Sequence, residues 1–556
     1  VMLVAEQNDT TNLKNSFSNL FGAISGFEES YGPYLWDKVG YHLVPFSSGA
    51  MEHATQIAYP EVTANGSLTY ETLMAHELAH SWWGNLVTCR TAEDMWLNEG
   101  MAAFSESLFL GHIYGHERYI NNVKANHKDV LLNAHIRDQG YYAIHGVPHA
   151  ITYGDHSYNK GADVAHTLRG YLGDQNFFDG LQSFLAANHF QDVDAYDFRD
   201  HLNQLSGVDV TDFFNDWVFN PGFPAFYIDS FAAVPSGNGI FDVTIYVKQK
   251  LKGTTQYFSN VPMEITFMKD DWTAQTHTFD CSNANSVLQI TLPFIPKIAY
   301  FNGNNKISQA VTGESLVINT LVTKDLSFPM FRFSTTSITD SAFVRVEHYW
   351  VSPDAPKNPE TEWMYHISNE RFWKVDGLFP TNFQSDIRIF FNGKTTVGSN
   401  LDTELTSLTG FHEDSLFVFY RQNSADDWKK VEDATIQSLG SKTDGYGYFT
   451  VDTMKVGEYT FGWKKSTTGI ETAQSNTQTF IVYPNPTKDI ITIATKTTFD
   501  EPIILQLMDI NGRLILTETF TDVNHIIDIS LLPSGTYFIN LFNETQYLGH
   551  KSIIKQ

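Results

Sequence analysis

The segments MAHELAHSWWGN at residues 74–85 and WLNEGMAAFSE at residues 96–106 decide how the rest of the chain is interpreted. The first segment contains the pattern H-E-x-x-H. On an α-helix, His76 and His80 lie four residues apart and therefore share one face. Two imidazoles in this arrangement can bind one Zn²⁺ at about 2.0–2.1 Å each. The pattern therefore predicts a helix that carries two ligands of a single metal ion.

The residues between and after the two histidines supply the other parts of a catalytic zinc site. Glu77 is expected to act as general base on a water whose pKa the metal lowers to about 7. A catalytic zinc also needs a third protein ligand and one open position. Glu99 follows His80 after eighteen residues, which leaves room for a turn and a second helix. The sequence thus predicts one catalytic zinc ion, with His76, His80 and Glu99 as its ligands.

A chance match is the alternative to this metal site. With 20 histidines in 556 residues, a random H-E-x-x-H is expected in roughly one such chain in twenty to thirty. The segment Asn98-Glu99-Gly100, on a following predicted helix at a workable spacing, makes chance a weaker explanation. If it were chance, the two histidines would be ordinary core residues.

Residues around Glu99 are candidates for supporting roles. Glu106 lies seven residues later on the same helix face, where it can hydrogen-bond a ligating histidine or remain a surface carboxylate. Asn98 is expected to fix the turn before Glu99. Other histidines favour ordinary surface or core positions over further metal sites, namely His112, His116, His127, His135, His145, His149, His156 and His166.

Composition and charge exclude several classes of partner. The chain has 36 Lys and Arg against 63 Asp and Glu, a net charge of −27, which argues against binding to nucleic acid or anionic membrane surfaces. No run of 18 apolar residues occurs, so no membrane span is predicted. The two cysteines, Cys89 and Cys281, cannot make disulfides the main source of stability.

The hydrophobic pattern divides the chain into regions, and 556 residues are too many for one core. Apolar residues recur at helical spacing in four segments before residue 224, namely Thr11–Glu29, Leu68–Trp83, Met95–Tyr114 and Gly161–Leu172. From about Phe226 the pattern alternates, as expected for strands. Such stretches are FDVTIYVKQ (241–249), MEITFMKDD (263–271), FVRVEHYWV (343–351), DIRIFFNG (386–393) and SLFVFYR (415–421).

The predicted fold is therefore multidomain. It has a mainly helical catalytic domain, two β-rich domains of which the first is a β-sandwich, a Ser/Thr-rich linker and a small C-terminal β-sandwich. Asn511-Gly512, between two apolar runs, predicts a hairpin in the last unit. The respective boundaries are 1–224, 225–324, 325–463, 464–479 and 480–556.

Four segments together resemble the aminopeptidase N family of zinc peptidases. HELAHSWWGNLVT and WLNEGMAAFSE match its metal-binding segments, and Gly49-Ala50-Met51-Glu52-His53 resembles its exopeptidase motif. Tyr158-Asn159-Lys160-Gly161-Ala162 resembles the segment that carries its transition-state tyrosine. The segments occur in family order within about residues 30–170. The resemblance implies a thermolysin-like catalytic domain that hydrolyses peptide bonds.

The resemblance also implies roles for residues outside the metal-binding segments. Tyr158 would hydrogen-bond the oxyanion that forms in the transition state; the alternative is an ordinary aromatic residue at a helix start. Glu52 would bind the free α-amino group of the substrate; the alternative is a solvated carboxylate. Gly49, Ala50 and Met51 would belong to the same substrate-binding segment.

The chain departs from the family in ways that leave its specificity open. Position 53 is His where Asn is commoner, and the family's usual N-terminal β-sheet domain is not expected within the residues given before the Gly-Ala-Met-Glu segment. The chain begins at Val1 without a visible signal peptide and is interpreted as a mature or truncated form. Trp217–Pro224 resembles the family's exit from the catalytic domain into a β-sandwich. A more open cleft is therefore expected.

The C-terminal unit carries a second resemblance, to the type IX secretion sorting domains of exported Bacteroidetes proteins. It rests on Tyr483-Pro484-Asn485-Pro486, on Gly535-Thr536-Tyr537-Phe538 and on the basic end at Lys551–Lys555. The alternative is a generic immunoglobulin-like spacer. The resemblance implies a secreted or cell-surface protein that engages the secretion machinery.

Three functions remain open at this point. The leading one is removal of N-terminal residues from peptide substrates. An endopeptidase with the same metal chemistry and an open cleft is the second. The third is a non-catalytic binding or adhesion protein, although the presence of both Glu77 and Tyr158 argues against a retired site.

Overall fold

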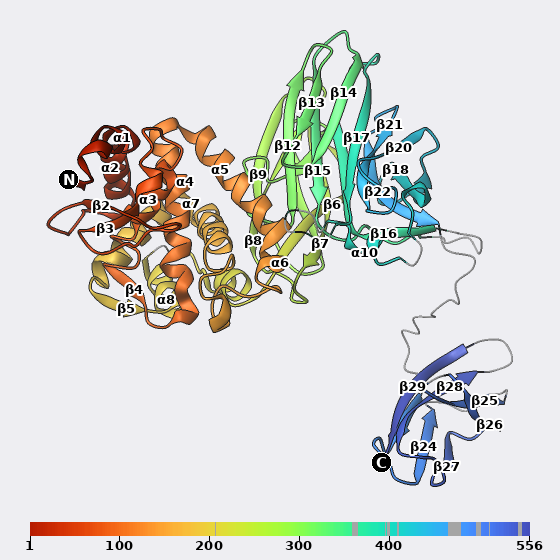
Figure 1. Ribbon diagram of the computed structural model, residues 1–556. Coiled ribbons are helices and arrows are strands. Elements are labelled where there is room, and N and C mark those ends of the chain that lie inside the picture. Colours follow the sequence, from red (N-terminus) through yellow and green to blue (C-terminus); the bar gives the residue numbers. More distant parts are fainter. Residues whose placement is uncertain are drawn as a thin grey trace. The chain divides into compact units, whose positions relative to one another are not determined.

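The structure is a computed structural model (Figure 1). It describes residues 1–205, 207–357, 365–394, 396, 398, 401–408, 411–464, 480–495, 502–510, 512–542 and 547–556. The chain divides into two compact units, Val1–Lys465 and Ser466–Gln556. The predicted linker falls almost entirely on residues 465–479, which lie outside the described residues. The multidomain organisation is confirmed, whereas the five predicted boundaries and the sandwich descriptions stay predictions.

The first part of unit 1 is built around helices. Its α-helices are α1 (Thr10–Ser16), α2 (Leu20–Tyr31), α3 (Glu71–Ala79), α4 (Glu99–Tyr114), α5 (His116–Asp129), α6 (His135–Arg137), α7 (Asn159–Ala187), α8 (Ala195–Leu205) and α9 (Thr211–Phe213). Short 3₁₀ segments are η1 (Gln7–Asp9), η2 (Glu61–Thr63), η3 (Ala92–Leu97) and η5 (His149–Ile151), and η4 (Val130–Ala134) and η6 (Phe214–Val218) are short π-helical segments. The parallel strands β1 (Met2–Val4), β2 (Gly40–Val44) and β3 (Ile57–Pro60) form one sheet. A parallel pair joins β4 (Val87–Cys89) and β5 (Gln191–Val193).

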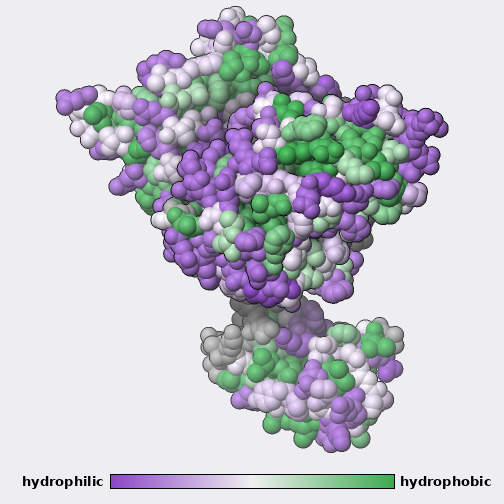
Figure 2. Space-filling view, turned by 90° about the vertical axis from the view of Figure 1, so that its left-hand side faces the viewer, coloured by the Kyte–Doolittle hydropathy of each residue, from purple (hydrophilic) through white to green (hydrophobic). Residues whose placement is uncertain are grey.

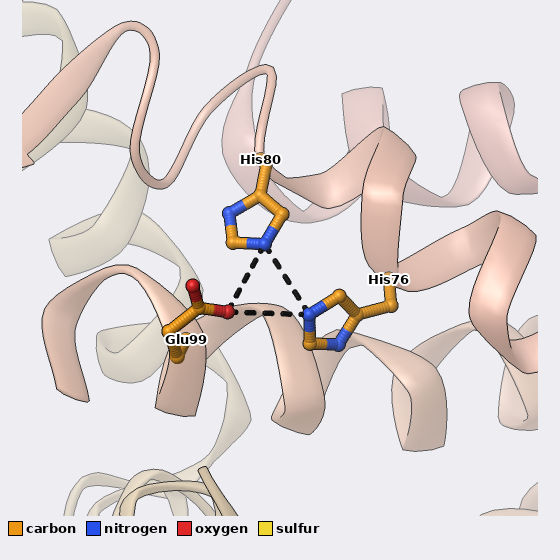
Figure 3. A group of neighbouring side chains, drawn as sticks. All are labelled: His76, His80 and Glu99. Atoms are coloured by element: carbon orange, nitrogen blue, oxygen red, sulfur yellow. Dashed lines mark hydrogen bonds and ion pairs between the residues drawn. The ribbon is translucent and has the colours of Figure 1, made fainter. Parts of the chain in front are cut away.

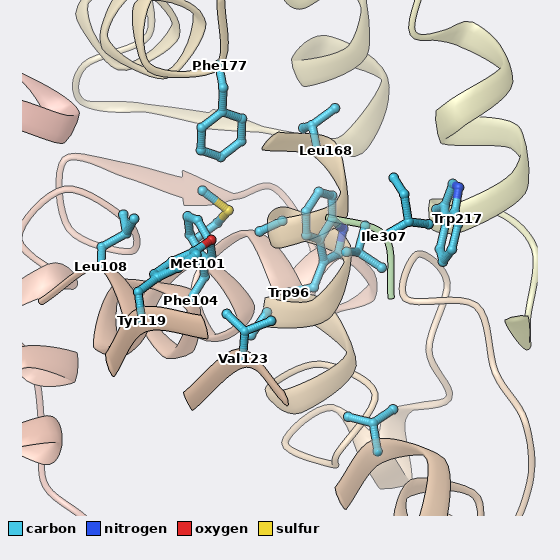
Figure 4. Packing of buried hydrophobic residues seen from close by; sticks show 14 of the residues in the cluster. Trp96, Met101, Phe104, Leu108, Tyr119, Val123, Leu168, Phe177, Trp217 and Ile307 are labelled. Atoms are coloured by element: carbon cyan, nitrogen blue, oxygen red, sulfur yellow. The ribbon is translucent and has the colours of Figure 1, made fainter. Parts of the chain in front are cut away.

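Helix α4 runs through the core of this part. A helix that is apolar on every side is usually buried, and most residues of α4 between Glu99 and Leu110 are buried. In Figure 4 its Met101, Phe104 and Leu108 pack among Trp96 and Phe177. Full burial of each such side chain contributes about 1.5–3 kcal/mol. This packing fixes the position of Glu99, the first residue of the helix.

The strands that follow share the core of the helices. One sheet has the order β10-β7-β6, with β10 (Asn285–Leu292), β7 (Ile240–Lys252) and β6 (Phe223–Gly237). A second has the order β11-β8-β9, with β11 (Ile298–Phe301), β8 (Val261–Met268) and β9 (Ala274–Cys281). Phe223, Phe226 and Phe258 belong to the same buried cluster as the helices. The hydrophobic core therefore continues across residue 224.

A six-stranded and a five-stranded sheet follow and enclose a second core. The first has the order β12 (Val311–Ile318), β15 (Ala342–Tyr349), β16 (Tyr365–Leu378), β22 (Gly457–Lys464), β18 (Leu416–Arg421) and β19 (Lys429–Lys430). The other has the order β13 (Thr323–Leu326), β14 (Phe331–Ser337), β17 (Gln384–Asn392), β21 (Tyr446–Val451) and β20 (Ala434–Ser438). Short turns α10 (Thr403–Thr406) and η7 (Glu413–Ser415) lie between strands. Trp373, Ile389 and Phe461 are buried between these sheets.

Unit 2 has its own core, which is mainly aliphatic and includes Ile491, Leu505, Ile539 and Ile553. Its sheets are β23 (Phe480–Tyr483), β24 (Ile490–Thr495) and β27 (Asn524–Asp528), and β26 (Leu514–Phe520), β25 (Ile503–Asp509), β28 (Gly535–Phe542) and β29 (Tyr547–Lys555). The predicted hairpin is confirmed by the antiparallel pairing of β25 with β26. Gly512 has the positive φ of 77° that favours glycine in such a turn, whereas Asn511 lies outside the described residues.

The molecular surface is largely hydrophilic on the face drawn in Figure 2, where hydrophobic residues occur in patches among hydrophilic ones. Among the helices of the described residues, none combines the length and apolar character needed to cross a bilayer.

Candidate metal centre

Three predicted ligand atoms meet at one point (Figure 3). The Nε2 atoms of His76 and His80 are 3.2 Å apart. Oε2 of Glu99 lies 3.4 Å from the first and 3.2 Å from the second. Ligands about 2.0–2.1 Å from a tetrahedral zinc are separated by about 3.3 Å, so the spacing fits one such ion. All three residues are buried, and they form the one cluster of three or more His, Cys, Asp or Glu with metal-ligand geometry in the described part of the chain.

The ends of two helices place these ligands. His76 lies in α3, and His80 directly follows the last residue of α3 with helical backbone angles. Glu99 opens α4, at the N-terminal end where a carboxylate is favoured by the helix dipole. Gly84 has a φ of 122°, and a Cβ there would lie 3.1 Å from Nδ1 of His80. The turn after α3 therefore needs glycine both for its backbone and for its close approach to a ligand.

Hydrogen bonds on the far side of each imidazole orient the ligands. Nδ1 of His76 lies 3.0 Å from Oε1 of Glu106, and Nδ1 of His80 lies 2.8 Å from the carbonyl oxygen of Trp83. Both acceptors need a proton on Nδ1, which leaves the Nε2 lone pairs facing the cluster. The structure thus brings Glu106 to the contact that its place on α4 predicts.

Asn98 connects the turn before α4 to strand β4. Its Oδ1 accepts a hydrogen bond of 3.0 Å from the Cys89 amide, and its Nδ2 donates one of 3.1 Å to Oγ1 of Thr88. These bonds hold the chain where it enters Glu99. They are the contacts expected of a residue that fixes this turn.

The ligand cluster has strongly shifted pKa values. Burial lowers the pKa of His76, but Glu106 and Glu99 outweigh burial and raise that pKa to about 10. Burial raises the pKa of Glu99, but His76 and His80 outweigh it and lower that pKa to about 2. Carboxylates thus surround the imidazoles, which is the electrostatic setting that favours a bound cation.

Glu77 lies on α3 with a carboxylate that is available for chemistry. The residue is 5% exposed, and its Oε2 has no hydrogen-bond partner. Burial raises its pKa to about 7, although His76 and His80 act in the opposite direction. A buried carboxylate without a partner is costly unless a ligand or water completes it.

Tyr158 lies at the start of α7 and reaches the same cluster. Its ring stacks on the imidazole of His76 with 6.1 Å between centroids and 9° between planes. Burial and the negative charge of Glu99 raise the pKa of Tyr158 well above its ordinary value. The phenol therefore stays protonated and can donate a hydrogen bond.

The segment 49–53 borders the site along strand β3. Met51 exchanges two hydrogen bonds of 2.9 Å with Ala58, which anchors the segment as an extra strand-like residue. The Glu52 carbonyl accepts a hydrogen bond of 2.7 Å from Asn85. The Glu52 carboxylate is half-buried and close enough to raise the pKa values of Glu77 and Tyr158. Gly49 and Met51 are exposed, and Ala50 is half-buried.

A close contact between α4 and α7 was not foreseen from the sequence. A Cβ on Gly100 would lie 2.8 Å from Cα of Gly161, and a Cβ on Gly161 would lie equally close to Cα of Gly100. These glycines adjoin Glu99 and Tyr158, so their contact sets the spacing between the two functional residues. Small residues beside both motifs were the available signal.

A small cavity of about 120 Å³ beside Tyr158 was also not predicted. Polar side chains from α4, α5 and α7 line it, among them Glu106, Asn126 and Asn159. Asn126 and Asn159 hydrogen-bond each other at 2.9 Å. The cavity combines residues from three helices, and no single segment of the sequence carries that information.

Several other histidines take part in buried hydrogen bonds. His127 bonds Asp163 at 2.7 Å, and His156 bonds Asp138 at 2.6 Å. His166 lies 2.6 Å from the hydroxyl of Tyr119. These contacts are typical of satisfied core histidines.

Comparisons with known proteins agree with the geometry. Residues 17–217 match the peptidase family M1 domain, and residues 481–555 match the secretion system C-terminal sorting domain. The probable aminopeptidase 1 of Saccharolobus solfataricus is 29% identical over 38% of this chain and 29% of its own length. Aminopeptidase N of Lactococcus lactis subsp. lactis is 32% identical over 38% of this chain and 27% of its own length. The chain therefore spans less than a third of either relative.

A solved structure of Legionella pneumophila aminopeptidase A in complex with aspartic acid is also similar. It is 17% identical, with a TM-score of 0.43 over 55% of this chain and 36% of that one.

The C-terminal sorting domain is of the type IX kind and indicates export. Residues 17–217 are thus a peptidase family M1 domain, joined in this chain to a type IX secretion sorting domain.

Proposed function

We propose that this chain is an exported zinc aminopeptidase that removes N-terminal residues from peptides. The M1 domain and its aminopeptidase relatives support peptide hydrolysis by a metallopeptidase. The observation that carries the proposal is the spacing of 3.2–3.4 Å among the ligand atoms of His76, His80 and Glu99. Two nitrogen ligands and one carboxylate oxygen are a donor set typical of catalytic zinc.

The side chains around the cluster divide the work of hydrolysis. A zinc ion held there would supply Lewis acidity toward the scissile carbonyl and the attacking water. Glu77 accepts the proton of that water, and its pKa of about 7 also suits return of the proton to the departing amine. Tyr158 stays protonated and donates a hydrogen bond from its hydroxyl group to the oxygen on which negative charge develops.

Glu52 gives the reaction its direction along the peptide. Its carboxylate pairs with the free α-ammonium group and so places the first peptide bond at Glu77 and Tyr158. Correct placement of reacting groups is worth a large part of catalysis. Glu106 and the carbonyl of Trp83 hold the two imidazoles in their ligating orientation.

Replacing Glu77 tests the catalytic assignment. Glu77→Gln keeps the shape of the side chain but removes the base, so turnover of an amino-acid anilide is expected to fall by about 10²–10⁴-fold. Zinc content by atomic absorption should stay at one ion per chain. Glu117→Gln, on the outside of α5, serves as matched control and should change neither value. Loss of zinc in Glu77→Gln would make Glu77 structural, and full turnover would remove it from the mechanism.

A pair of substrates separates aminopeptidase from endopeptidase action. A peptide with a free amine should be cleaved, and its N-acetylated form should be resistant because no ammonium group pairs with Glu52. Equal rates on both peptides would contradict the role of Glu52 and favour an endopeptidase. Absence of hydrolysis with zinc bound would favour a binding protein instead.

A further inference from the structure

A second cavity, of about 310 Å³, lies where the helical part meets the β-strands of unit 1. Residues of η4 and α6 line one side, and residues of β7 and β16 line the other. In Figure 1, α6 lies beside the group of strands that includes β7. The volume is within the range of small-molecule sites in proteins. None of the residues assigned to the metal centre lines this cavity.

Two opposite charges face the cavity without contacting each other. Lys252 ends β7, and Glu370 lies in β16. Within the described part of the chain, the ammonium group of Lys252 has no hydrogen-bond or ion-pair partner. The same holds for the carboxylate of Glu370. Burial lowers the pKa of Lys252 and raises that of Glu370, and each charge partly offsets the effect on the other. Both residues are half-buried, and a partly desolvated charge is stabilised when a ligand group of opposite charge pairs with it.

The remaining polar residues add hydrogen-bonding groups but no further net charge. Arg371 pairs with Asp402 through bonds of 2.8 and 2.7 Å, and both side chains are 1% exposed. The other terminal nitrogen of Arg371, Nη1, is buried without a partner, as is Nδ1 of His135. Burial lowers the pKa of His135 to about 4, so its ring is neutral. Among the lining residues, Lys252 is therefore the cation and Glu370 the anion without an ion-pair partner in the described part of the chain. Arg371 and His135 add nitrogen atoms without hydrogen-bond partners.

The charges limit which ligand can occupy this space. An inorganic anion would pair with Lys252 but would be repelled by Glu370. A metal cation would meet the reverse problem. A purely apolar molecule would leave both charges unpaired. A small zwitterion satisfies both charges. An apolar side chain fits against the apolar part of the wall, which is formed by Leu131, Leu132, Ile136, Trp350 and Leu401, and Tyr141 and Thr403 complete the lining.

We propose that this cavity binds the zwitterion of a free α-amino acid with an apolar side chain. The ligand carboxylate pairs with Lys252 and its ammonium group with Glu370. The assignment does not depend on the proposed peptidase activity. The free amino acid that such an activity releases nevertheless belongs to the same chemical class.

Isothermal titration calorimetry tests the ligand class on the full chain. The protein carries Glu52→Gln and is depleted of metal by chelation, so that the metal centre cannot account for binding. L-leucine and L-phenylalanine are expected to bind. N-acetyl-leucine lacks the ammonium group and leucinamide lacks the carboxylate, so each should bind at least about tenfold more weakly. Leu-Leu dipeptide tests whether the occupant is a peptide instead.

Substitutions at the cavity test its location. Lys252→Met and Glu370→Gln should each weaken leucine binding at least about tenfold, whereas the exposed controls Lys324→Met and Glu6→Gln should not. The analogue series needs no substitution in the cavity, so it stands even if a variant folds poorly.

Several results would overturn the proposal. They are the absence of leucine binding at millimolar concentration, equal binding of the single-charge analogues, and binding that both cavity variants leave unchanged. Tighter binding of Leu-Leu than of leucine would assign the cavity to peptides and reject the amino-acid assignment.

Discussion

In the proposed metal centre, Glu106 would act through its contact with His76. Its carboxylate oxygen lies 3.0 Å from Nδ1 of that imidazole, and its side chain is 29% exposed. A carboxylate in this position fixes the ring and makes the opposite nitrogen a better ligand. The expected contribution of Glu106 is therefore to metal affinity, through its contact with His76.

Glu106→Gln should weaken zinc binding about 10–100-fold, because an amide accepts the same hydrogen bond without the negative charge. Competition with a chromophoric chelator measures this affinity directly. At saturating zinc, turnover should recover most of its original value. Glu117→Gln again provides a surface control. Unchanged zinc affinity would mean that the hydrogen bond has no influence on the ligand.

At the scale of elements, the site depends on how closely α4 approaches α7. Glu99 is the first residue of α4, and Tyr158 directly precedes α7. Gly100 and Gly161 let the two backbones touch, since a Cβ on either would come within 2.8 Å of the other's Cα. Backbone atoms cannot move aside as the end of a side chain can. The distance between Glu99 and Tyr158 therefore depends on the absence of a Cβ atom at both glycines.

Gly161→Ala should separate the two helices and reduce both stability and turnover. Overpacking of this kind costs about 1–3 kcal/mol, which exceeds the helix propensity that alanine adds. Urea unfolding and kcat measure the two effects. Gly22→Ala in α2 is the matched control, because its Cβ would meet only the flexible end of Ile113. A fully stable, fully active Gly161→Ala would show that the contact does not set the site.

His166 joins α7 to α5 and to the segment after β11. Its Nδ1 lies 2.6 Å from the Tyr119 hydroxyl, and its Nε2 lies 2.7 Å from the Asn305 carbonyl. A neutral ring satisfies both contacts, with Nε2 donating and Nδ1 accepting. Burial lowers its pKa from 6.5 to about 4, although the Asn305 carbonyl acts in the opposite direction. The unfolded chain thus binds more protons than the folded chain between these two pH values.

Acid should therefore weaken the fold through His166. The free energy of unfolding is expected to fall as the pH decreases from about 6.5 to about 4, with a contribution from this residue of at most about 3 kcal/mol. His166→Gln should show a shallower decrease in urea unfolding at several pH values. His189→Gln, at an exposed histidine, should retain the original slope. Equal slopes in all three proteins would contradict this assignment.

The sequence predicted the elements better than their partners. Helical spacing identified α4 and α7 and the ligand pair on α3, because a 3.6-residue period and an i, i+4 pair are local properties. The helical spacing in Thr11–Glu29 does not mark the break that the structure has between α1 and α2. Alternation marks a strand but not its sheet. Strand β12 lies within the predicted segment 225–324, but it pairs with β15 in the later six-stranded sheet.

The candidate site followed the same rule. The sequence predicted that His76, His80 and Glu99 come together, because their spacing along two helices nearly determines their positions. It predicted the contact of Glu106 because this residue shares a helix face with Glu99. The Gly100–Gly161 contact and both cavities join residues that are far apart in the chain. Their prediction requires knowledge of how helices and strands pack, which periodicity does not contain.

At the scale of the molecule, the two compact units have separate cores. Among the described residues, the core of unit 2 is formed by residues of unit 2 alone. Because a domain with its own core can fold independently, the metal centre should not require the sorting domain. The export signal and the proposed chemistry are thus carried by different folding units.

A shortened chain that ends at Lys465 should keep the properties of unit 1. Its zinc content and its turnover are expected to match those of the full chain within error. The thermal unfolding midpoint of unit 1 should also be unchanged. Differential scanning calorimetry of the full chain should show an additional transition that the shortened chain lacks. A large loss of turnover would mean that residues 466–556 support the centre.

The predicted boundary at residue 224, within unit 1, is not a comparable place to cut. Phe223, Phe226 and Phe258 are buried in the same cluster as the core residues of the helices. A fragment that stopped at residue 224 would therefore expose part of its hydrophobic core to water. Such a fragment would be prone to aggregate before its zinc ligands could be assayed. Recombinant work on the peptidase chemistry therefore has to retain the strands that follow it.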